Sequence, residues 1–234
     1  MRSVRLGAGR PAKRSALLLA VLALAVTATA GTAQAAGPPT QCSGAFTGTT
    51  PGNLTVPSGD FCIIIGASIG GNVLVSPGAI GFHSHHSTIN GSVLSPGPIV
   101  FDVRVLDSTV GHNVLVGQMR AGTAGGICRS TIGDNVILEN NAGFMNVGSG
   151  FPFDVCPFPT SGNHIGGNLI VDDNSGGNTI INNTVDGSVL VNDNTNFEDI
   201  FDNLIGHTLE CNDNTPPPSS AANTASNFVG QCTS

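Results

Sequence analysis

A seven-residue pattern recurs along the chain at an almost constant interval. In most copies it reads apolar residue, Gly or Asp, any residue, Asn or Ser, and then two or three apolar residues. Successive copies start 19 to 22 residues apart, except for one interval of 33 residues. A fixed period of about 20 residues indicates a solenoid, in which each repeat buries its apolar side against the next. The clear copies begin at Ile69, Ile89, Val110, Ile132, Ile165, Val185 and Ile205, and a weaker copy begins at Thr50.

The apolar run within each copy is short and rich in β-branched residues, and Gly and Asn bound it. This composition favours a buried parallel strand over a helix. Helix-breaking and turn-forming residues interrupt the chain throughout, which disfavours helices further. We therefore predict an all-β fold, a parallel β-helix with about eight coils of about 20 residues.

Equivalent positions of successive coils lie roughly 4.8 Å apart in a parallel β-helix, so an alignment column becomes a ladder in space. Asn side chains in such a column can pair amide with amide, and Asn tolerates the left-handed backbone that bends require. We expect the apolar columns to form the core. The column three residues after each start is Asn53, Asn72, Ser92, Asn113, Asn135, Asn168, Ser188 and Thr208.

The N-terminal segment has the features of a secretory signal peptide. A basic start precedes an apolar run, and small residues follow up to Ala35, where we expect cleavage. The apolar run is too short for a stable membrane span, and no second stretch of spanning length follows. The sequence thus predicts export and a secreted, extracellular location. The expected division is signal peptide 1–35, N-terminal cap 36–49, coils 50–224 and C-terminal cap 225–234.

The charge of the chain after the leader excludes several classes of partner. All fifteen acidic residues lie there, with only three basic residues, Arg104, Arg120 and Arg129, so its formal net charge is −12. Such a surface repels phosphate backbones and anionic lipid, so we expect no nucleic-acid binding. The expected partner is a protein or another component of the cell envelope.

Six cysteines follow the leader, and an exported chain of this kind is expected to be disulfide-bonded. Six cysteines allow fifteen connectivities, but the coil register selects one of them. Stacked Cα atoms at about 4.8 Å fall inside the range of about 4.4 to 6.8 Å that a disulfide needs. Cysteines that are nearly level on neighbouring coils predict clamps at the two ends, and the remaining pair flanks the irregular interval. The predicted pairs are Cys42–Cys62, Cys211–Cys232 and Cys128–Cys156.

The interval of 33 residues contains an excess of about 13 residues over the period, which predicts an inserted loop over 141–163. This segment holds four of the eleven Phe residues of the chain. Apolar residues on a protruding segment are otherwise costly, so Phe151, Phe153 and Phe158 are candidate partner contacts. The alternative is that these rings fold back over the coil beneath.

The coil pattern resembles secreted bacterial right-handed parallel β-helix proteins, in particular an uncharacterised group with IxGNLxV-type coils and a Cys-containing tail. The likeness rests on IGGNVLV from Ile69, IGGNLIV from Ile165 and the closing segment that ends at Cys232. It implies a right-handed parallel β-helix over about Thr50 to Cys232. It implies no catalytic residues.

Three acidic turns repeat in register, and their central residues Asp173, Asp193 and Asp213 are 20 residues apart. Stacked carboxylates repel each other and invite a hard cation such as calcium. The alternative is a solvated polar turn column, which the absence of the GGxGxD calcium motif favours. We expect no cofactor and no metal at these residues.

The segment FHSHH carries the densest histidine cluster, His83, His85 and His86, and His112 is a candidate neighbour one coil on. Strand alternation places His83 and His85 on one face and His86 on the other, so at most two could share a metal within one coil. His85 also falls in a largely apolar column. A structural or surface role is therefore the expectation.

Many β-helix proteins are polysaccharide lyases or hydrolases, so such an enzyme is the alternative function. The arginines lie several coils from the Asp column, and the chain has no Trp or Tyr to stack on sugars. Ice binding by a Thr column is disfavoured, because His164 and Leu204 interrupt Thr88, Thr109, Thr131 and Thr184. The sequence favours an exported, non-catalytic structural or interaction module at the cell surface or in the medium.

Overall fold

The computed structural model describes residues 39–149, 155–156 and 162–233, and within them the chain forms 27 short strands and no helix. The strands belong to three all-parallel sheets of ten, nine and eight strands, named here sheets A, B and C. Sheet A contains β1 Thr40–Gln41, β4 Leu54–Val56, β7 Val73–Val75, β10 Val93–Ser95, β13 Val114–Gly117, β16 Val136–Glu139, β19 Leu169–Asp172, β22 Val189–Asn192, β25 Thr208–Asn212 and β27 Asn227–Gly230.

The other two sheets complete each coil. Sheet B contains β2 Gly44–Phe46, β5 Phe61–Ile65, β8 Gly81–His85, β11 Asp102–Leu106, β14 Ala124–Cys128, β17 Phe144–Gly148, β20 Asn178–Ile181, β23 Glu198–Phe201 and β26 Ser219–Ala221. Sheet C contains β3 Thr49–Thr50, β6 Ser68–Ile69, β9 Thr88–Ile89, β12 Thr109–Val110, β15 Thr131–Ile132, β18 His164–Ile165, β21 Thr184–Val185 and β24 Leu204–Ile205.

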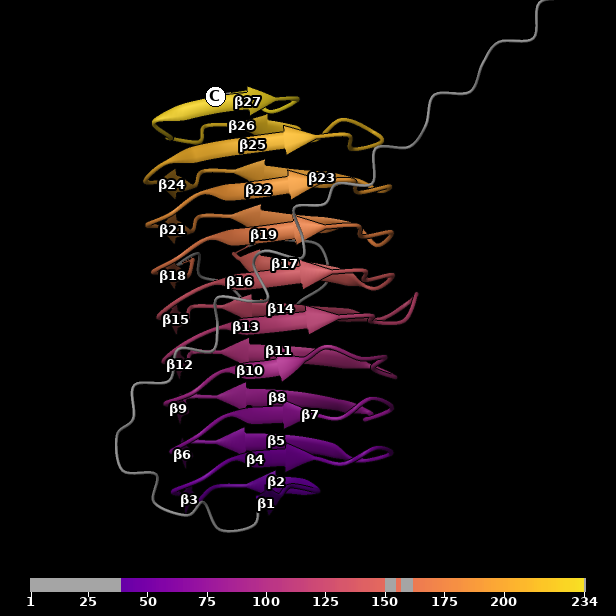
Figure 1. The fold of residues 1–234 in the computed structure, drawn as a ribbon, viewed down its shortest axis with the longest axis vertical. Coiled ribbons are helices and arrows are strands. Elements are labelled where there is room, and N and C mark those ends of the chain that lie inside the picture. The colour runs from indigo at the N-terminus through magenta and orange to yellow at the C-terminus, as the bar shows by residue number, and fades with distance from the viewer. Residues whose placement is uncertain (1–38, 150–154, 157–161, 234) are drawn as a thin grey trace, which may run out of the picture. The chain divides into compact units, whose positions relative to one another are not determined.

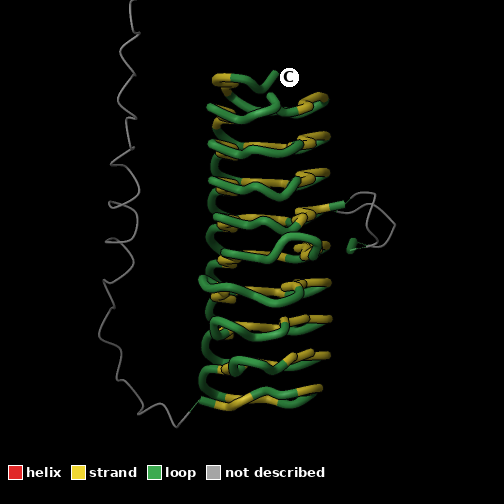
Figure 2. Tube along the Cα trace, turned by 90° about the vertical axis from the view of Figure 1, so that its right-hand side faces the viewer, coloured by secondary structure: helices red, strands yellow, loops and turns green. Residues whose placement is uncertain are grey.

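The chain visits sheets A, B and C in turn and then returns to sheet A one coil further on, for about nine turns. In Figure 1 the strands of sheet A run to the right in front and those of sheet B run to the left behind them, so the rising coil is right-handed. Figure 2 shows the bends between sheets A and B stacked in register. The predicted parallel β-helix is confirmed, with one turn more than expected because residues 40–50 already pair with the following coil.

A single apolar core fills the coil. The first residue of the repeated pattern lies in sheet C and points inward, so Ile69, Ile89 and Val110 are in register and fully buried. In sheet A the first and third residues of each apolar run point inward, as Val73 and Val75 do. The middle residue of each run points outward and is partly exposed. The expectation that every apolar column lies in the core is therefore wrong for this column.

Three polar ladders hold the bends, one at each corner of the coil. Their side-chain oxygens accept hydrogen bonds from backbone N–H groups of a neighbouring coil, and several Asn side chains also pair amide with amide, as predicted. The ladder between sheets C and A is the predicted Asn and Ser column. The ladder between sheets B and C comprises Ser87, Ser108, Ser130, Asn163, Asn183, Asn203 and Asn223. The ladder between sheets A and B comprises Asn141, Asn174, Asn194 and Asn214.

Glycine occupies the second pattern position in several copies because the coils approach closely there. A Cβ at Gly133 would lie 2.1 Å from the carbonyl oxygen of Gly111, and a Cβ at Gly206 would lie 2.2 Å from that of Asp186. A carbon atom cannot approach an oxygen so closely without moving the backbone. The short turn between sheets C and A therefore depends on these glycines.

Within the segment predicted as an insertion, residues 141–163, the structure contains a regular strand. β17 pairs with β14 on one side and β20 on the other, so it belongs to the normal coil. The extra length lies between Gly148 and His164. In that interval Val155 packs on the outer face of sheet B beside Gly126, and it is almost fully buried.

The three predicted cysteine pairs are present as disulfides. Cys42–Cys62 and Cys211–Cys232 connect neighbouring coils at the two ends, with Cα atoms 5.5 and 5.3 Å apart. Cys128–Cys156 joins the irregular interval to sheet B, with Cα atoms 5.6 Å apart. Such cross-links are consistent with an extracellular or oxidising environment.

Candidate functional site

The outer face of sheet A carries a continuous row of six aliphatic side chains, named here the aliphatic ladder. Each is the outward middle residue of its strand, and each is in register with the next across the parallel pairing. All six are partly exposed. Thr55 precedes them in the same column, and Glu210 and Val229 follow. The ladder consists of Leu74, Leu94, Leu115, Ile137, Ile170 and Leu190.

Two columns flank the aliphatic ladder on this face. On one side lies the Asn and Ser ladder of the bend between sheets C and A. On the other side the residues are Pro57, Ser76, Pro96 and Gly117 in the N-terminal half, followed by Glu139 and Asp172. The face is therefore apolar along its midline and uncharged over its N-terminal half.

The acidic turns lie beside this face, at the bend between sheets A and B. Asp173, Asp193 and Asp213 stack as predicted, and all three adopt left-handed backbone with φ of 53° to 55°. Burial, together with the charges of Asp173, Asp193 and Glu139, raises the pKa of Asp172 to about 6. Among the residues that the structure describes, no group of three His, Cys, Asp or Glu side chains could hold a metal ion. The column accounts for the bends, which need left-handed residues.

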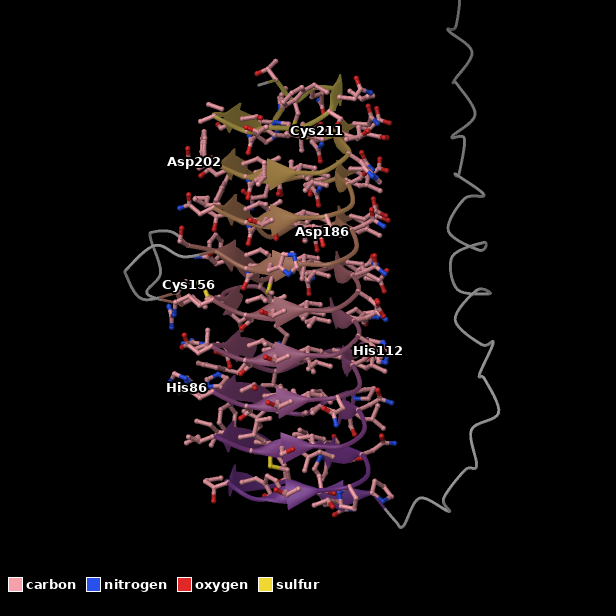
Figure 3. All side chains as sticks on the ribbon, turned by 90° about the vertical axis from the view of Figure 1, so that its left-hand side faces the viewer. His86, His112, Cys156, Asp186, Asp202 and Cys211 are labelled. Atoms are coloured by element: carbon pink, nitrogen blue, oxygen red, sulfur yellow. A yellow bond between two sulfur atoms is a disulfide. The ribbon has the colours of Figure 1, made fainter. Side chains whose placement is uncertain are left out.

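The histidine cluster lies on the outer face of sheet B. His83 and His85 share that face as predicted, with ring centroids 6.1 Å apart. Burial lowers the pKa of His85, and the charges of His83 and His86 lower it further. His112 does not join them, because it lies at the bend after sheet C, where Nδ1 is 2.9 Å from Asp134. Figure 3 shows His86 and His112 at opposite edges of the sheet C face.

A buried carboxylate, Asp102, lies beneath this cluster, and the sequence analysis did not identify it. Asp102 is fully buried, and it accepts a hydrogen bond from Arg104 Nε at 2.6 Å while its other oxygen lies 2.8 Å from His83 Nε2. The signal was the two-residue spacing of Asp102 and Arg104 on one strand face, with His83 in register one coil earlier. The Asp102 carboxylate thus bridges Arg104 and His83.

A second ion pair lies nearby at the bend between sheets B and C. Arg129 donates two hydrogen bonds to Asp107, at 2.7 and 2.6 Å. The hydrogen bond from Arg129 lowers the pKa of Asp107. Arg104 and Arg129, the two arginines of this side of the coil, thus each have a carboxylate partner.

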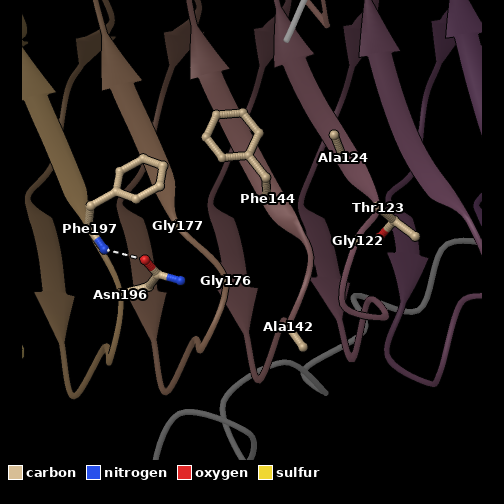
Figure 4. Close-up of a pocket in the computed structure, with 9 residues that line it drawn as sticks. All are labelled: Gly122, Thr123, Ala124, Ala142, Phe144, Gly176, Gly177, Asn196 and Phe197. Atoms are coloured by element: carbon tan, nitrogen blue, oxygen red, sulfur yellow. Dashed lines mark hydrogen bonds between the residues drawn. The ribbon is translucent and has the colours of Figure 1, made fainter. Parts of the chain in front are cut away.

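A small hollow lies on the bend between sheets A and B, with a volume of about 270 Å³. Phe144 and Phe197 stand on either side of Gly177, with ring centroids 6.1 Å apart (Figure 4). Asn196, beside them, accepts a hydrogen bond from the N–H of Phe197. Ligand sites have about 300 to 1,000 Å³ and several convergent polar groups, so this hollow is a poor candidate.

Among the described residues, one ionisable side chain points into the core of the coil. Glu198 occupies the core column of Met145 and is 1% exposed. Burial raises its pKa to about 9, so the carboxyl is protonated at pH 7. One oxygen accepts a hydrogen bond from Asn178 Nδ2 at 2.9 Å, and the other has no hydrogen-bond partner among the described residues. Its partner Asn178, one coil earlier in the same column, is fully buried as well.

The remaining predicted site residues are the phenylalanines of the irregular interval. Phe151, Phe153 and Phe158 lie outside the described residues, so their role as partner contacts stays a prediction. The predicted Thr column lies exposed on sheet C, where Thr88, Thr109 and Thr131 are in register. His164 and Leu204 interrupt that column as expected.

No protein-family model, curated protein or solved structure matches the chain. The described part contains no helix of the length and apolar character needed to cross a membrane. Of the features described, the aliphatic ladder is the most extensive surface whose chemistry the coil itself does not require.

Proposed function

We propose that the chain is an exported, rigid, non-catalytic interaction module whose contact face is the outer face of sheet A. The aliphatic ladder is the observation that carries this proposal. Contiguous exposed apolar patches mark interaction sites on soluble proteins. Here six aliphatic side chains stand in one row on a parallel sheet, in register from each strand to the next.

Export is supported by the N-terminal sequence and by the disulfides. A basic, apolar and then small-residue segment ends near Ala35, and all six cysteines follow it. All six are paired in the structure. Disulfides persist in oxidising compartments outside the cytosol. The proposed location is the cell surface or the medium.

A non-catalytic role is supported by the state of the charged groups. Asp102 is shared between His83 and Arg104, and Asp107 is held by Arg129. A general base or a transition-state cation would need to be available to a substrate. These groups are instead engaged with each other on the surface of sheet B.

A capture experiment with the oxidised chain tests the contact face. The immobilised chain is incubated with cell-envelope extract, and the parent is compared with a Leu94→Gln/Leu115→Gln variant. Leu204→Gln is the matched control, since Leu204 is 55% exposed on sheet C. Captured material should be lost with the double variant and kept with the control. Equal capture by the parent and the double variant would refute the contact face.

Two further arms test the other parts of the proposal. A Phe151→Ala/Phe153→Ala variant tests whether the contact lies on the irregular interval and not on sheet A. A contact on the irregular interval would make capture depend on these two rings. A panel of uronate polysaccharides, with and without calcium, tests the absence of catalysis. Cleavage of any member would overturn the non-catalytic assignment.

A further inference from the structure

We infer that the aliphatic ladder binds a second copy of this chain, so that two solenoids pack through their sheet A faces and run in opposite directions. This inference rests on the proposed function, because it names the partner of the same face. It follows from the period, the charge and the area of the face.

The period of the aliphatic ladder selects its partner. Neighbouring parallel strands lie about 4.8 Å apart, so the six side chains form a row with that repeat. The turns of an α-helix repeat every 5.4 Å, so a helix along the row would drift by about 3 Å over five steps, more than half a repeat. A second copy has the same repeat and stays in phase over the whole row. Interdigitation along the full ladder therefore requires another stacked parallel coil.

The charges select the relative direction. Glu210 lies in the ladder column itself, directly beyond Leu190. In a parallel pair related by a two-fold axis along the coil, Glu210 would face its own equivalent, and opposed like charges are destabilising. In an antiparallel pair centred between Leu115 and Ile137, Glu210 faces Thr55.

The flanking acidic column favours the same direction. In the antiparallel pair Glu139 faces Gly117, and Asp172 faces Pro96, since the column reverses about the same centre. Each carboxylate then meets an uncharged residue of the N-terminal half. The N-terminal half of one copy thus covers the acidic half of the other.

The area is sufficient for a specific dimer. The ladder column from Thr55 to Val229 has nine rows. At about 4.8 Å per row and a width of about 15 Å, the face covers about 650 Å² per copy. The pair would then bury about 1,300 Å² in total, which lies in the range of specific interfaces. We expect a dissociation constant of about 1 µM, tightening with salt, because the net charge of −12 on each copy is then screened.

Sedimentation of the purified, oxidised chain tests the inference. The parent should have twice the mass of one chain at about 100 µM and should dissociate on dilution below about 1 µM. Leu115→Lys and Ile137→Asp should each sediment as monomers, at least about a hundredfold weaker, because each buries an unpaired charge. Leu204→Lys, on the sheet C face, should remain dimeric. Circular dichroism and thiol titration establish that each variant is folded and oxidised.

Mixing the two single variants tests the direction of packing. In the antiparallel pair Lys at 115 of one copy faces Asp at 137 of the other, so an equimolar mixture should recover the dimer. In a parallel pair Lys at 115 would face Leu115 and Asp at 137 would face Ile137, so each charge opposes an aliphatic side chain and recovery would be weaker. A mixture of Leu94→Lys and Ile170→Asp separates the two directions further, because its charges face each other only in the antiparallel pair. A mixture that stays monomeric overturns the antiparallel arrangement, and a parent that stays monomeric at about 100 µM overturns self-association altogether.

The two proposals fail in different ways. A monomeric parent that still captures another protein through the ladder refutes the second copy and leaves the contact face standing. A parent that captures the same material as the Leu94→Gln/Leu115→Gln variant refutes the contact face itself. A dimer whose mass does not change with Leu115→Lys forms through another surface; it refutes the second copy at the ladder, and the capture experiment then decides on the contact face.

Discussion

Replacing Asn203 with alanine should strongly destabilise the coil for a change of one polar side chain. Asn203 is 2% exposed and lies at the bend between sheets B and C. Its Oδ1 accepts hydrogen bonds from the N–H and the Nδ2 of Asn183, at 2.9 and 3.0 Å. Its Nδ2 donates to the carbonyl of Ile180 at 2.8 Å and to Oδ1 of Asn223 at 2.9 Å. One side chain thus connects three successive coils.

The four hydrogen bonds set the expected magnitude. A typical hydrogen bond contributes about 1 kcal/mol net, and a buried donor left without a partner costs about 1 to 3 kcal/mol. Asn203→Ala removes all four and leaves the N–H of Asn183 buried without an acceptor. We expect the free energy of unfolding to fall by about 4 kcal/mol. Few single substitutions exceed that value.

The same ladder supplies a milder substitution. Ser108 occupies the equivalent position in an earlier coil, where its hydroxyl accepts from the N–H of Ser87 and donates to the carbonyl of Leu106. Asn203→Ser should therefore keep an acceptor for the N–H of Asn183 and lose the side-chain pairing. The expected cost is about half that of alanine, about 2 kcal/mol.

Urea unfolding of the oxidised protein, followed by far-ultraviolet circular dichroism, measures these differences. Asn192→Ala is the control, because Asn192 is partly exposed and its Oδ1 accepts one hydrogen bond, from the N–H of Asn212 at 3.0 Å. That variant should lose about 1 kcal/mol. Hydrogen exchange at Asn183 should accelerate in the alanine variant. The reasoning would be refuted if Asn203→Ala lowered the free energy of unfolding no more than Asn192→Ala does. It would also be refuted if Asn203→Ser lowered it as much as Asn203→Ala does.

Three further substitutions probe other parts of the coil. The pKa of Glu198 rises from 4.5 to about 9 on folding, so the stability that the protonated acid allows below pH 4.5 is lost as the pH rises toward 9. Glu198→Gln should remove this pH dependence and raise the free energy of unfolding by about 3 kcal/mol at pH 7. Urea unfolding across that pH range measures both effects. Gly133→Ala should lower the melting temperature sharply, since its Cβ would lie 2.1 Å from the carbonyl oxygen of Gly111, whereas Gly52→Ala, with open space around it, should not. Cys232→Ser should speed hydrogen exchange in the last coil alone, because coils contact only their neighbours.

The register of the coil could be predicted from sequence because one period governs it. Once Ile69 and Ile89 are aligned, every other column follows, including the Asn and Ser ladder and the end clamp between Cys42 and Cys62. A parallel solenoid allows few alternative registers, since a shift of one strand relative to its neighbours would move every residue of that coil out of its column. The limit lies at the irregular interval, where Phe144 belongs to a regular strand that sequence spacing assigned to the insertion.

The direction of individual side chains was harder to predict. A run such as Val73 to Val75 is apolar at all three positions, so its composition suggests a wholly buried strand. Only the alternation of side chains along the strand places the middle leucine on the outer face. The pairing of Asp102 with His83 was missed for a related reason. A side chain on the outer face of sheet B can still be buried when neighbouring side chains cover it, as Asp102 is, and a sequence pattern does not show which side chain covers another.

The aliphatic ladder is a property of the surface and not a requirement of the coil, because the same column accepts polar side chains. Thr55 and Glu210 hold equivalent positions at its ends, paired in the same register as the residues between them. Four of the six ladder residues are leucine, although β-branched residues suit an exposed strand better. The fold would be served by threonine or valine there. A long, flexible apolar side chain at a fixed repeat is better explained by contact with another surface, and a surface of the same repeat is available in every other copy of the chain.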